Sequence, residues 1–199
     1  MRSPVDRMTE SLPSPWPTII DWIVTIVVAV GAVLAIKQWV VNPYRIPSAS
    51  MEPTLHCAEP MPGCLSGFSD RVLANRFIYR FRDPERGEIV VFETPQQAFE
   101  RCGAGGTFVK RIVGLPGDQL VQRDGVLTVN GQRMNETYLA NPRNLGRDFE
   151  RTLRDNQYFM MGDNRTSSCD SRDWGPVTRE ALIGPVFAVY WPPQRIGFR

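Results

Sequence analysis

The chain has 199 residues, which is enough for one domain and a short additional segment. Its formal net charge is +2, and the basic residues are scattered rather than gathered in a stripe. Since the sequence also carries no nucleic-acid-binding motif, we predict no nucleic-acid partner. Only two of the 23 basic residues, Lys37 and Lys110, are lysines, so the use of lysine there needs a reason beyond charge.

The first predicted element is an apolar helix over residues 19–36, interrupted only by Asp21 and Thr25. A helix of that length measures about 27 Å, close to the thickness of the hydrocarbon core of a bilayer. Tryptophans stand where interfacial aromatic residues are common, at Trp16, Trp22 and Trp39. These features predict that the chain is anchored in a membrane.

Two interpretations of the apolar run compete. The first is a tail over residues 1–17 followed by a retained transmembrane helix over residues 18–41. The second is a cleavable signal peptide, which is disfavoured because the small residues with the required spacing, Ala29 and Gly31, lie inside the run. Basic residues occur on both sides of the run, so charge does not decide its orientation.

Residues 42–199 are predicted to be all-β. Strand candidates are short segments rich in β-branched and aromatic residues, at 71–74, 88–92, 108–113, 157–161 and 186–191. Asp124-Gly125 and Asn130-Gly131 are hairpin turn signals on either side of residues 127–129. Residues 141–155 are polar and are predicted to form a surface loop.

The chemistry of the chain is limited by what it lacks. The only histidine, His56, lies in a loop with Pro and Cys, which gives little support to a Ser-His-Asp triad. The four cysteines form no Cys-x-x-Cys pair and no phosphate-binding loop is present, so we predict no metal and no cofactor. A hydroxyl nucleophile paired with Lys110 remains, because a buried lysine can lose its proton and act as a base. The alternative is that Lys110 is an ordinary half-exposed strand lysine.

Three segments carry this chemistry. Tyr-Arg-Ile-Pro-Ser-Ala-Ser-Met-Glu-Pro-Thr-Leu covers residues 44–55, and Phe-Val-Lys-Arg-Ile-Val-Gly-Leu-Pro-Gly-Asp covers residues 108–118. Met-Gly-Asp-Asn-Arg-Thr-Ser-Ser-Cys-Asp-Ser-Arg-Asp-Trp-Gly covers residues 161–175. In this order after one apolar helix, they closely resemble the bacterial type I signal peptidases, membrane-bound Ser-Lys leader peptidases. The resemblance extends over roughly residues 20–195.

The resemblance implies a role for each matching residue. Ser50 matches the nucleophile, Lys110 its general base, and Ser48 a serine whose hydroxyl joins the Ser50 N–H in the oxyanion hole. Ser168 matches a serine that hydrogen-bonds the lysine, and Asp170 and Arg172 a charge pair that braces this segment. Positions lining the pockets for small side chains are matched by Ile46, Pro47, Met51, Leu55 and Val109.

Structural alternatives remain for three of these assignments. Ser48 could cap the turn after Pro47, Ser168 could be a loop hydroxyl, and Asp170 with Arg172 could be an ordinary surface pair. Asp163 and Asn164 could form only a turn, and Trp174 is predicted to serve packing rather than chemistry.

As a whole, the resemblance implies a mainly β fold of coiled antiparallel sheets with one N-terminal transmembrane helix. Residues 1–17 would be cytoplasmic, and residues 42–199 an extracytoplasmic catalytic domain at the cell membrane. The implied activity removes signal peptides from secretory preproteins after small-x-small motifs, with the preproteins and the lipid bilayer as partners.

Two rival functions are weighed against it. One is a self-cleaving Ser-Lys protease of the LexA-repressor type, which the apolar helix and the lack of a DNA-binding helix-turn-helix oppose. The other is a non-enzymatic anchored β domain that binds peptides by strand addition. This second rival has no need for Ser50 and Lys110 to meet.

The cysteines are expected to form two disulfides, Cys57–Cys64 and Cys102–Cys169, because an extracytoplasmic domain permits them. Residues 58–63 are rich in turn formers and can bring the first pair together. Cys102 precedes the Lys110 strand and Cys169 follows Ser168, so the chemistry already requires their surroundings to converge. Four reduced buried cysteines are the alternative.

Overall fold

The computed structural model describes residues 15–39, 41–139 and 146–199, in two units comprising residues 1–41 and 42–199. In the first unit, helix α2 runs from Trp16–Trp39 and exposes apolar side chains such as Trp22 and Ile26. It begins inside the predicted tail of residues 1–17, because Pro17 is tolerated in the first turn of a helix. Residues 1–14 of that tail lie outside the described residues.

A membrane span was predicted over residues 18–41, of which residue 40 and the side chains of residues 35–39 lie outside the description. Among the residues that are described, no helix combines the length and the apolar character needed to cross a membrane.

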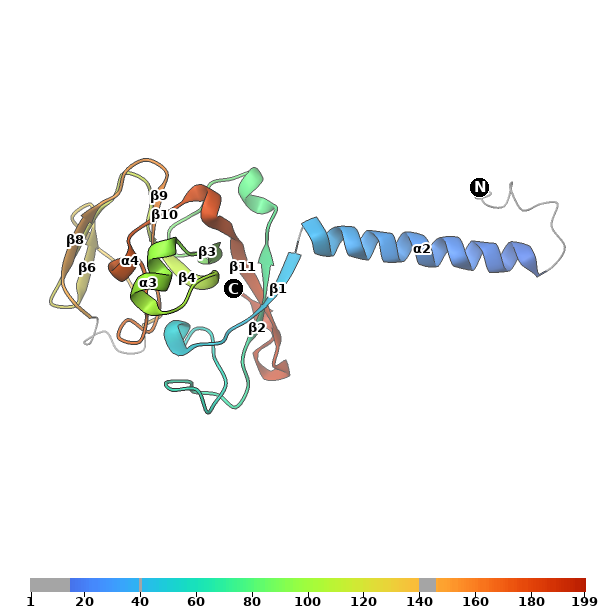
Figure 1. Cartoon of the computed structure of the whole chain (residues 1–199), viewed down its shortest axis with the longest axis horizontal. Helices are drawn as coiled ribbons and strands as arrows, with labels where there is room; N and C mark the ends of the chain where they lie inside the picture. Colours follow the sequence, from blue (N-terminus) through green and yellow to red (C-terminus); the bar gives the residue numbers. More distant parts are fainter. Residues whose placement is uncertain (1–14, 40, 140–145) are drawn as a thin grey trace. The chain divides into compact units, whose positions relative to one another are not determined.

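The second unit consists mainly of antiparallel strands in two sheets (Figure 1). The larger sheet has eight strands in the order β1-β2-β11-β3-β4-β9-β10, with β12 paired to β11. Its strands are β1 (Val41–Arg45), β2 (Arg71–Asn75), β3 (Ile89–Glu93), β4 (Thr107–Gly114), β9 (Gln157–Met161), β10 (Val177–Thr178), β11 (Leu182–Trp191) and β12 (Gly197–Phe198). The smaller sheet, in the order β7-β6-β5-β8, contains β5 (Gln119–Arg123), β6 (Val126–Val129), β7 (Gln132–Arg133) and β8 (Phe149–Thr152).

Short helices join these strands. They are the α-helices α3 (Gln96–Cys102) and α4 (Ser171–Trp174), and the 3-10 helices η1 (Ala49–Met51), η2 (Ile78–Arg80), η3 (Arg179–Ala181) and η4 (Pro193–Arg195). The prediction of an all-β region was therefore wrong in detail, since α3 and α4 lie within it. A surface loop was predicted over residues 141–155, of which residues 141–145 lie outside the described residues. The remainder contains β8, which pairs with β5 in register Leu120↔Arg151.

The predicted strands and turns are otherwise confirmed. The strands predicted over residues 71–74, 88–92, 108–113 and 157–161 agree with β2, β3, β4 and β9 to within one residue at each end. β11 ends as predicted but begins at Leu182, four residues earlier than expected. Both turn pairs have positive φ, at Asp124, Gly125, Asn130 and Gly131, which is the backbone of a type I′ hairpin.

The core of the second unit holds three groups of buried apolar residues. One group includes Ile46, Met51 and Leu55 and underlies the first chemistry-bearing segment. A second includes Val90, Phe92 and Trp174 and packs against the faces of β3 and β4. The third fills the space under the smaller sheet, including Leu120 and Phe159. Trp174 is buried with its ring 5.9 Å from that of Phe92, which confirms its predicted packing role.

Candidate active site

Ser50 lies in the one-turn helix η1, and its burial is set by its neighbours. Met51 and Leu55 are buried in the core and hold the segment down. The Ser50 carbonyl accepts a hydrogen bond from the backbone N–H of Asn164 at 3.1 Å. The first and third segments are thus joined through the backbone at the serine itself.

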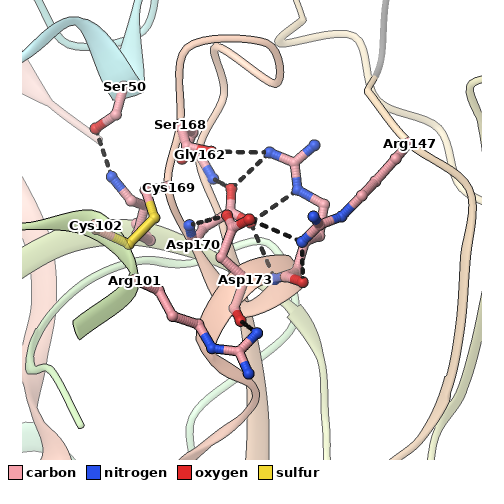
Figure 2. Close-up of a disulfide and its surroundings, with 11 residues drawn as sticks. Ser50, Arg101, Cys102, Arg147, Gly162, Ser168, Cys169, Asp170 and Asp173 are labelled. Carbon is pink, nitrogen blue, oxygen red and sulfur yellow. Dashed lines mark hydrogen bonds and ion pairs between the residues drawn. A yellow bond between two sulfur atoms is a disulfide. The ribbon is translucent and has the colours of Figure 1, made fainter. Parts of the chain in front are cut away.

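Lys110 reaches Ser50 from strand β4, where it pairs with Val90 of β3. Its Nζ lies 2.5 Å from Ser50 Oγ, as the dashed line from Ser50 in Figure 2 marks. The side chain is only 3% exposed, and the Phe108 ring lies 5.5 Å from the amine. The alternative of a half-exposed strand lysine is therefore excluded.

Because it is buried, the Lys110 ammonium loses its proton more easily, which a base near neutral pH requires. Loss of solvation lowers the pKa of Lys110 to about 8, against the opposing attraction of the Asp170 and Asp163 carboxylates. The Arg172 guanidinium adds a smaller effect in the lowering direction. Desolvation wins because neither carboxylate forms an ion pair with the lysine; each is paired with an arginine instead.

Asp170 and Arg172 form a buried ion pair, which excludes the alternative of an ordinary surface pair. Arg172 Nε and Nη2 donate to the two carboxylate oxygens of Asp170, both at 2.8 Å. Asp170 also accepts from the Gly162 N–H at 3.0 Å and caps α4. Burial would raise the pKa of Asp170, but the hydrogen bonds and charge of Arg172 outweigh it and hold the pKa below its ordinary value.

Ser168 lies beside this pair but does not make the predicted hydrogen bond to Lys110. Its Oγ is buried and has no hydrogen-bond partner within the described residues. The hydroxyl packs against Gly162 (Figure 2), where a Cβ would lie 2.3 Å from Ser168 Oγ and 2.4 Å from the Ser50 carbonyl oxygen. Glycine is therefore required at residue 162 for the segments to approach each other.

The Ser48 side chain is exposed, and its Oγ lies 3.3 Å from Ser50 Oγ. Ser48 stands at the N-cap of η1, but its side chain makes no capping hydrogen bond. The capping alternative is thus not supported, and the hydroxyl is available beside the serine–lysine contact.

A cavity of about 430 Å³ opens in front of Ser50 and Lys110. Residues 44–48 and 50–51 line one part, and residues 104–105 and 107–110 another. Four of the predicted pocket residues are among them: Ile46, Pro47, Met51 and Val109. Leu55, the fifth, does not line it and is fully buried in the core. This cavity therefore gives no support to the assignment of Leu55 to the pocket, which stays a prediction.

Several supporting residues were not found from the sequence. Asp163, interpreted as a possible turn residue, accepts two hydrogen bonds from Arg111, at 2.9 and 2.6 Å. The Arg111 guanidinium also lies 3.9 Å from the centre of the Tyr138 ring. Arg165 is paired with Glu136. The only available signal was the position of Arg111 directly after Lys110, which did not identify a partner.

His56 contacts the carboxylate of Glu52 through Nδ1 and belongs to the support of the loop. Glu52 is buried and also accepts from the backbone N–H groups of Cys57 and Leu65. Within the described parts of the chain, no group of three or more His, Cys, Asp or Glu side chains could hold a metal ion. The hydroxyl of Ser50 contacts Lys110 and Ser48, whereas the imidazole of His56 contacts Glu52.

Both predicted disulfides are confirmed. Cys57 is joined to Cys64, with Cα atoms 5.1 Å apart, and Cys102 to Cys169, with Cα atoms 6.1 Å apart. The second bridge is drawn in Figure 2 beside Ser168 and Asp170. All four cysteines are therefore oxidised.

A serine hydroxyl touching the amine of a buried lysine, in a mainly β unit, is the arrangement of a serine hydrolase with lysine in place of histidine. Comparison with known proteins makes the class specific. The family model described as signal peptidase, peptidase S26, matches residues 19–191. The chain belongs to this family and is a serine endopeptidase that cleaves signal peptides.

Two relatives agree with this placement in their sequences. A probable signal peptidase I-2 of Synechocystis sp. is 41% identical over 173 residues, which is 87% of this chain and 73% of that protein. Signal peptidase I of Bacillus amyloliquefaciens is 33% identical over 188 residues, 89% of this chain and 91% of that protein. A crystal structure of a signal peptidase I from Enterococcus faecalis V583 is 32% identical and covers 52% of this chain and 97% of that chain, with a TM-score of 0.45.

Proposed function

We propose that Ser50 is the nucleophile of this peptidase and that Lys110 is its general base. The observation that carries this assignment is the 2.5 Å contact between Ser50 Oγ and the Nζ of a lysine that is buried and has its pKa lowered to about 8. The rival of a non-enzymatic peptide-binding domain needs no such contact. Self-cleavage of the LexA type is opposed by the family membership.

In the proposed reaction, the neutral Lys110 amine accepts the proton of Ser50 as Oγ attacks the scissile carbonyl carbon. The resulting ammonium then donates this proton to the departing amine, which leaves an acyl-enzyme on Ser50. Water attacks the ester in the second half, with Lys110 again accepting the proton, and the free serine returns. Lysine therefore cycles between two charge states, which arginine cannot do.

The oxyanion of the tetrahedral intermediate is assigned to two donors, the Ser48 hydroxyl and the Ser50 backbone N–H. Support comes from the 3.3 Å separation of the two serine oxygens and from the absence of a capping role for Ser48. A donor that acts on developing negative charge contributes roughly 3–4 kcal/mol to catalysis.

The proposed substrates are secretory preproteins, cut after small-x-small motifs. Ile46, Pro47, Met51 and Val109 line the cavity next to Ser50 and leave room for small side chains. Strand β4 pairs with β3 from Thr107, but with β9 only from Arg111 onward. Residues 107–110 therefore offer one edge without a strand partner in the described chain, along which an extended peptide can add.

We also propose that residues 18–41 anchor the chain in the cell membrane, with residues 1–17 cytoplasmic and the catalytic domain 42–199 extracytoplasmic. The exposed apolar side chains of α2 support the anchor, and the two disulfides support an oxidising compartment. Protease added outside intact spheroplasts should degrade residues 42–199. Their survival, alongside degradation of an exported control, would reverse the topology.

The catalytic assignment is tested by cleavage of a preprotein in detergent. Ser50→Ala should abolish cleavage, and Lys110→Arg should reduce it at least ~10³-fold with folding intact. Lys37→Arg is the matched control, because Lys37 is the only other lysine and lies outside the catalytic domain. Near-normal turnover by Lys110→Arg would show that another group is the base.

A further inference from the structure

The disulfide between Cys102 and Cys169 lies in the wall of the cavity that contains Ser50 and Lys110. Cys102 ends helix α3, and Cys169 stands between Ser168 and Asp170. Figure 2 shows the bridge at the place where these two parts of the chain meet, on the side of the site that faces Ser50. The other disulfide, Cys57–Cys64, is buried and does not line this cavity.

The bridge anchors the approach to the strand that carries the base. Residues 103–106 read Gly-Ala-Gly-Gly, a flexible connection between α3 and β4. The strand end of this connection is held by β3, because Thr107 pairs with Glu93 and the Gly106 carbonyl accepts from the Thr94 N–H at 2.8 Å. The bridge holds its other end, where α3 finishes at Cys102. Besides the packing of Ala98 and Trp174 in one buried apolar group, α3 is linked to the third segment by a hydrogen bond from Arg101 Nη1 to the Asp173 carbonyl at 2.7 Å. Arg101 is exposed, so this link is weaker than the covalent one.

Exclusion of water is what makes Lys110 a usable base. The groups that face its amine are Ser50 from η1, and the charged side chains Asp163, Asp170 and Arg172 from the third segment. Both carboxylates favour the protonated amine, and only burial opposes them strongly. Cys102, Cys169 and Phe108 pack together on the apolar group beneath β3 and β4, next to the amine. Opening this wall would admit water at the point where the site depends on its absence.

We propose that the Cys102–Cys169 disulfide positions the active site by closing the cavity wall beside Lys110 and keeping water from the lysine amine. This inference rests on the assignment of Ser50 and Lys110 under the proposed function. The disulfide does not take part in bond cleavage or in proton transfer. Its effect on the rate is exerted through the surroundings of Lys110.

The test is the pH dependence of kcat/KM for Cys102→Ala/Cys169→Ala. The acid limb of the profile should move to higher pH by about one unit or more, so cleavage falls roughly tenfold at pH 7 and recovers as the pH approaches 10. A purely structural bridge would lower the rate equally at every pH. Either that result or an unmoved limb overturns the proposal. Cys57→Ala/Cys64→Ala is the matched control, whose limb should stay in place.

A second measurement uses the wild-type enzyme and is needed if the double variant does not fold. The half-exposed Cys102–Cys169 bridge should be reduced before the buried one, which peptide mapping verifies. Wild-type enzyme reduced only at this bridge should show the same shifted limb, and reoxidation should restore the original one. An unshifted limb after verified reduction contradicts the proposal. Activity of Ser50→Ala would instead overturn the catalytic assignment, so the two failures are distinguishable.

Discussion

Burial of Lys110 predicts a steep dependence of the peptidase rate on pH. The neutral amine is the active form, so activity rises as the pH rises through the lysine pKa of about 8. At that pKa, about one amine in eleven is neutral at pH 7 and about nine in ten at pH 9. An exposed lysine with a pKa of about 10.5 would be neutral in only about one molecule in 3,000 at pH 7. Burial of Lys110 therefore increases the fraction of neutral amine at pH 7 by roughly two to three orders of magnitude.

The assay is kcat/KM for a small-x-small substrate between pH 6 and pH 10, which reports ionisation of the free enzyme. We expect a rise of about tenfold from pH 6 to pH 7 and a plateau above about pH 9. Circular dichroism at each pH separates ionisation from unfolding. A flat profile, or an acid limb centred near pH 10.5, would refute the argument that burial controls the base.

Three further predictions follow from the same geometry. Lys110→Met should be inactive but more stable by up to roughly 3 kcal/mol at pH 7, as measured by urea unfolding, because the buried charge is removed. Since the folded pKa of Lys110 lies below the unfolded one, this advantage is complete below about pH 8 and disappears by about pH 10.5; an equal advantage at pH 11 contradicts it. Gly162→Ala should lower kcat/KM by about 10²-fold and cost roughly 1–3 kcal/mol, because its Cβ would lie 2.4 Å from the Ser50 carbonyl oxygen; wild-type kinetics and melting would disprove the close approach. Ser48→Ala should lower kcat about 10²–10³-fold with little change in KM or melting temperature, and an unchanged kcat would remove Ser48 from the oxyanion hole.

Local signals in the sequence predicted the parts of the fold that local physics controls. Asp-Gly and Asn-Gly pairs identified two hairpins, because positive φ at both central residues is best tolerated by these residues. Alternating and β-branched segments identified β2, β3, β4 and β9. The contact of Ser50 with Lys110, 60 residues apart, came instead from motif resemblance and from the chemical need for a base.

The parts that could not be predicted depend on partners distant in the sequence. β8 is polar and owes its pairing to β5, so its own residues predict a loop. The motif resemblance predicts Leu55 as a pocket residue, but its side chain is fully buried in the core. Which residues of a loop are buried depends on packing partners that are distant in the sequence. The predicted hydrogen bond from Ser168 to Lys110 is missing because of the orientation of the Ser168 hydroxyl, which no sequence pattern encodes. Arg111 and Asp163 gave no sign of their pairing because 52 residues separate them.

The arginine pairs explain how the site can hold two buried carboxylates near a lysine and still keep that lysine usable as a base. A free carboxylate near Lys110 would attract the ammonium form and raise its pKa, cancelling the effect of burial. Here Asp163 is neutralised by Arg111, and Asp170 by Arg172, so neither needs the lysine as its partner. Both arginines keep their charge at any working pH, so the neutralisation holds while Lys110 gains and loses its proton. The predominance of arginine over lysine in the sequence thus has a local purpose at this site: fixed charges balance the carboxylates, and the one titratable cation is left to Ser50.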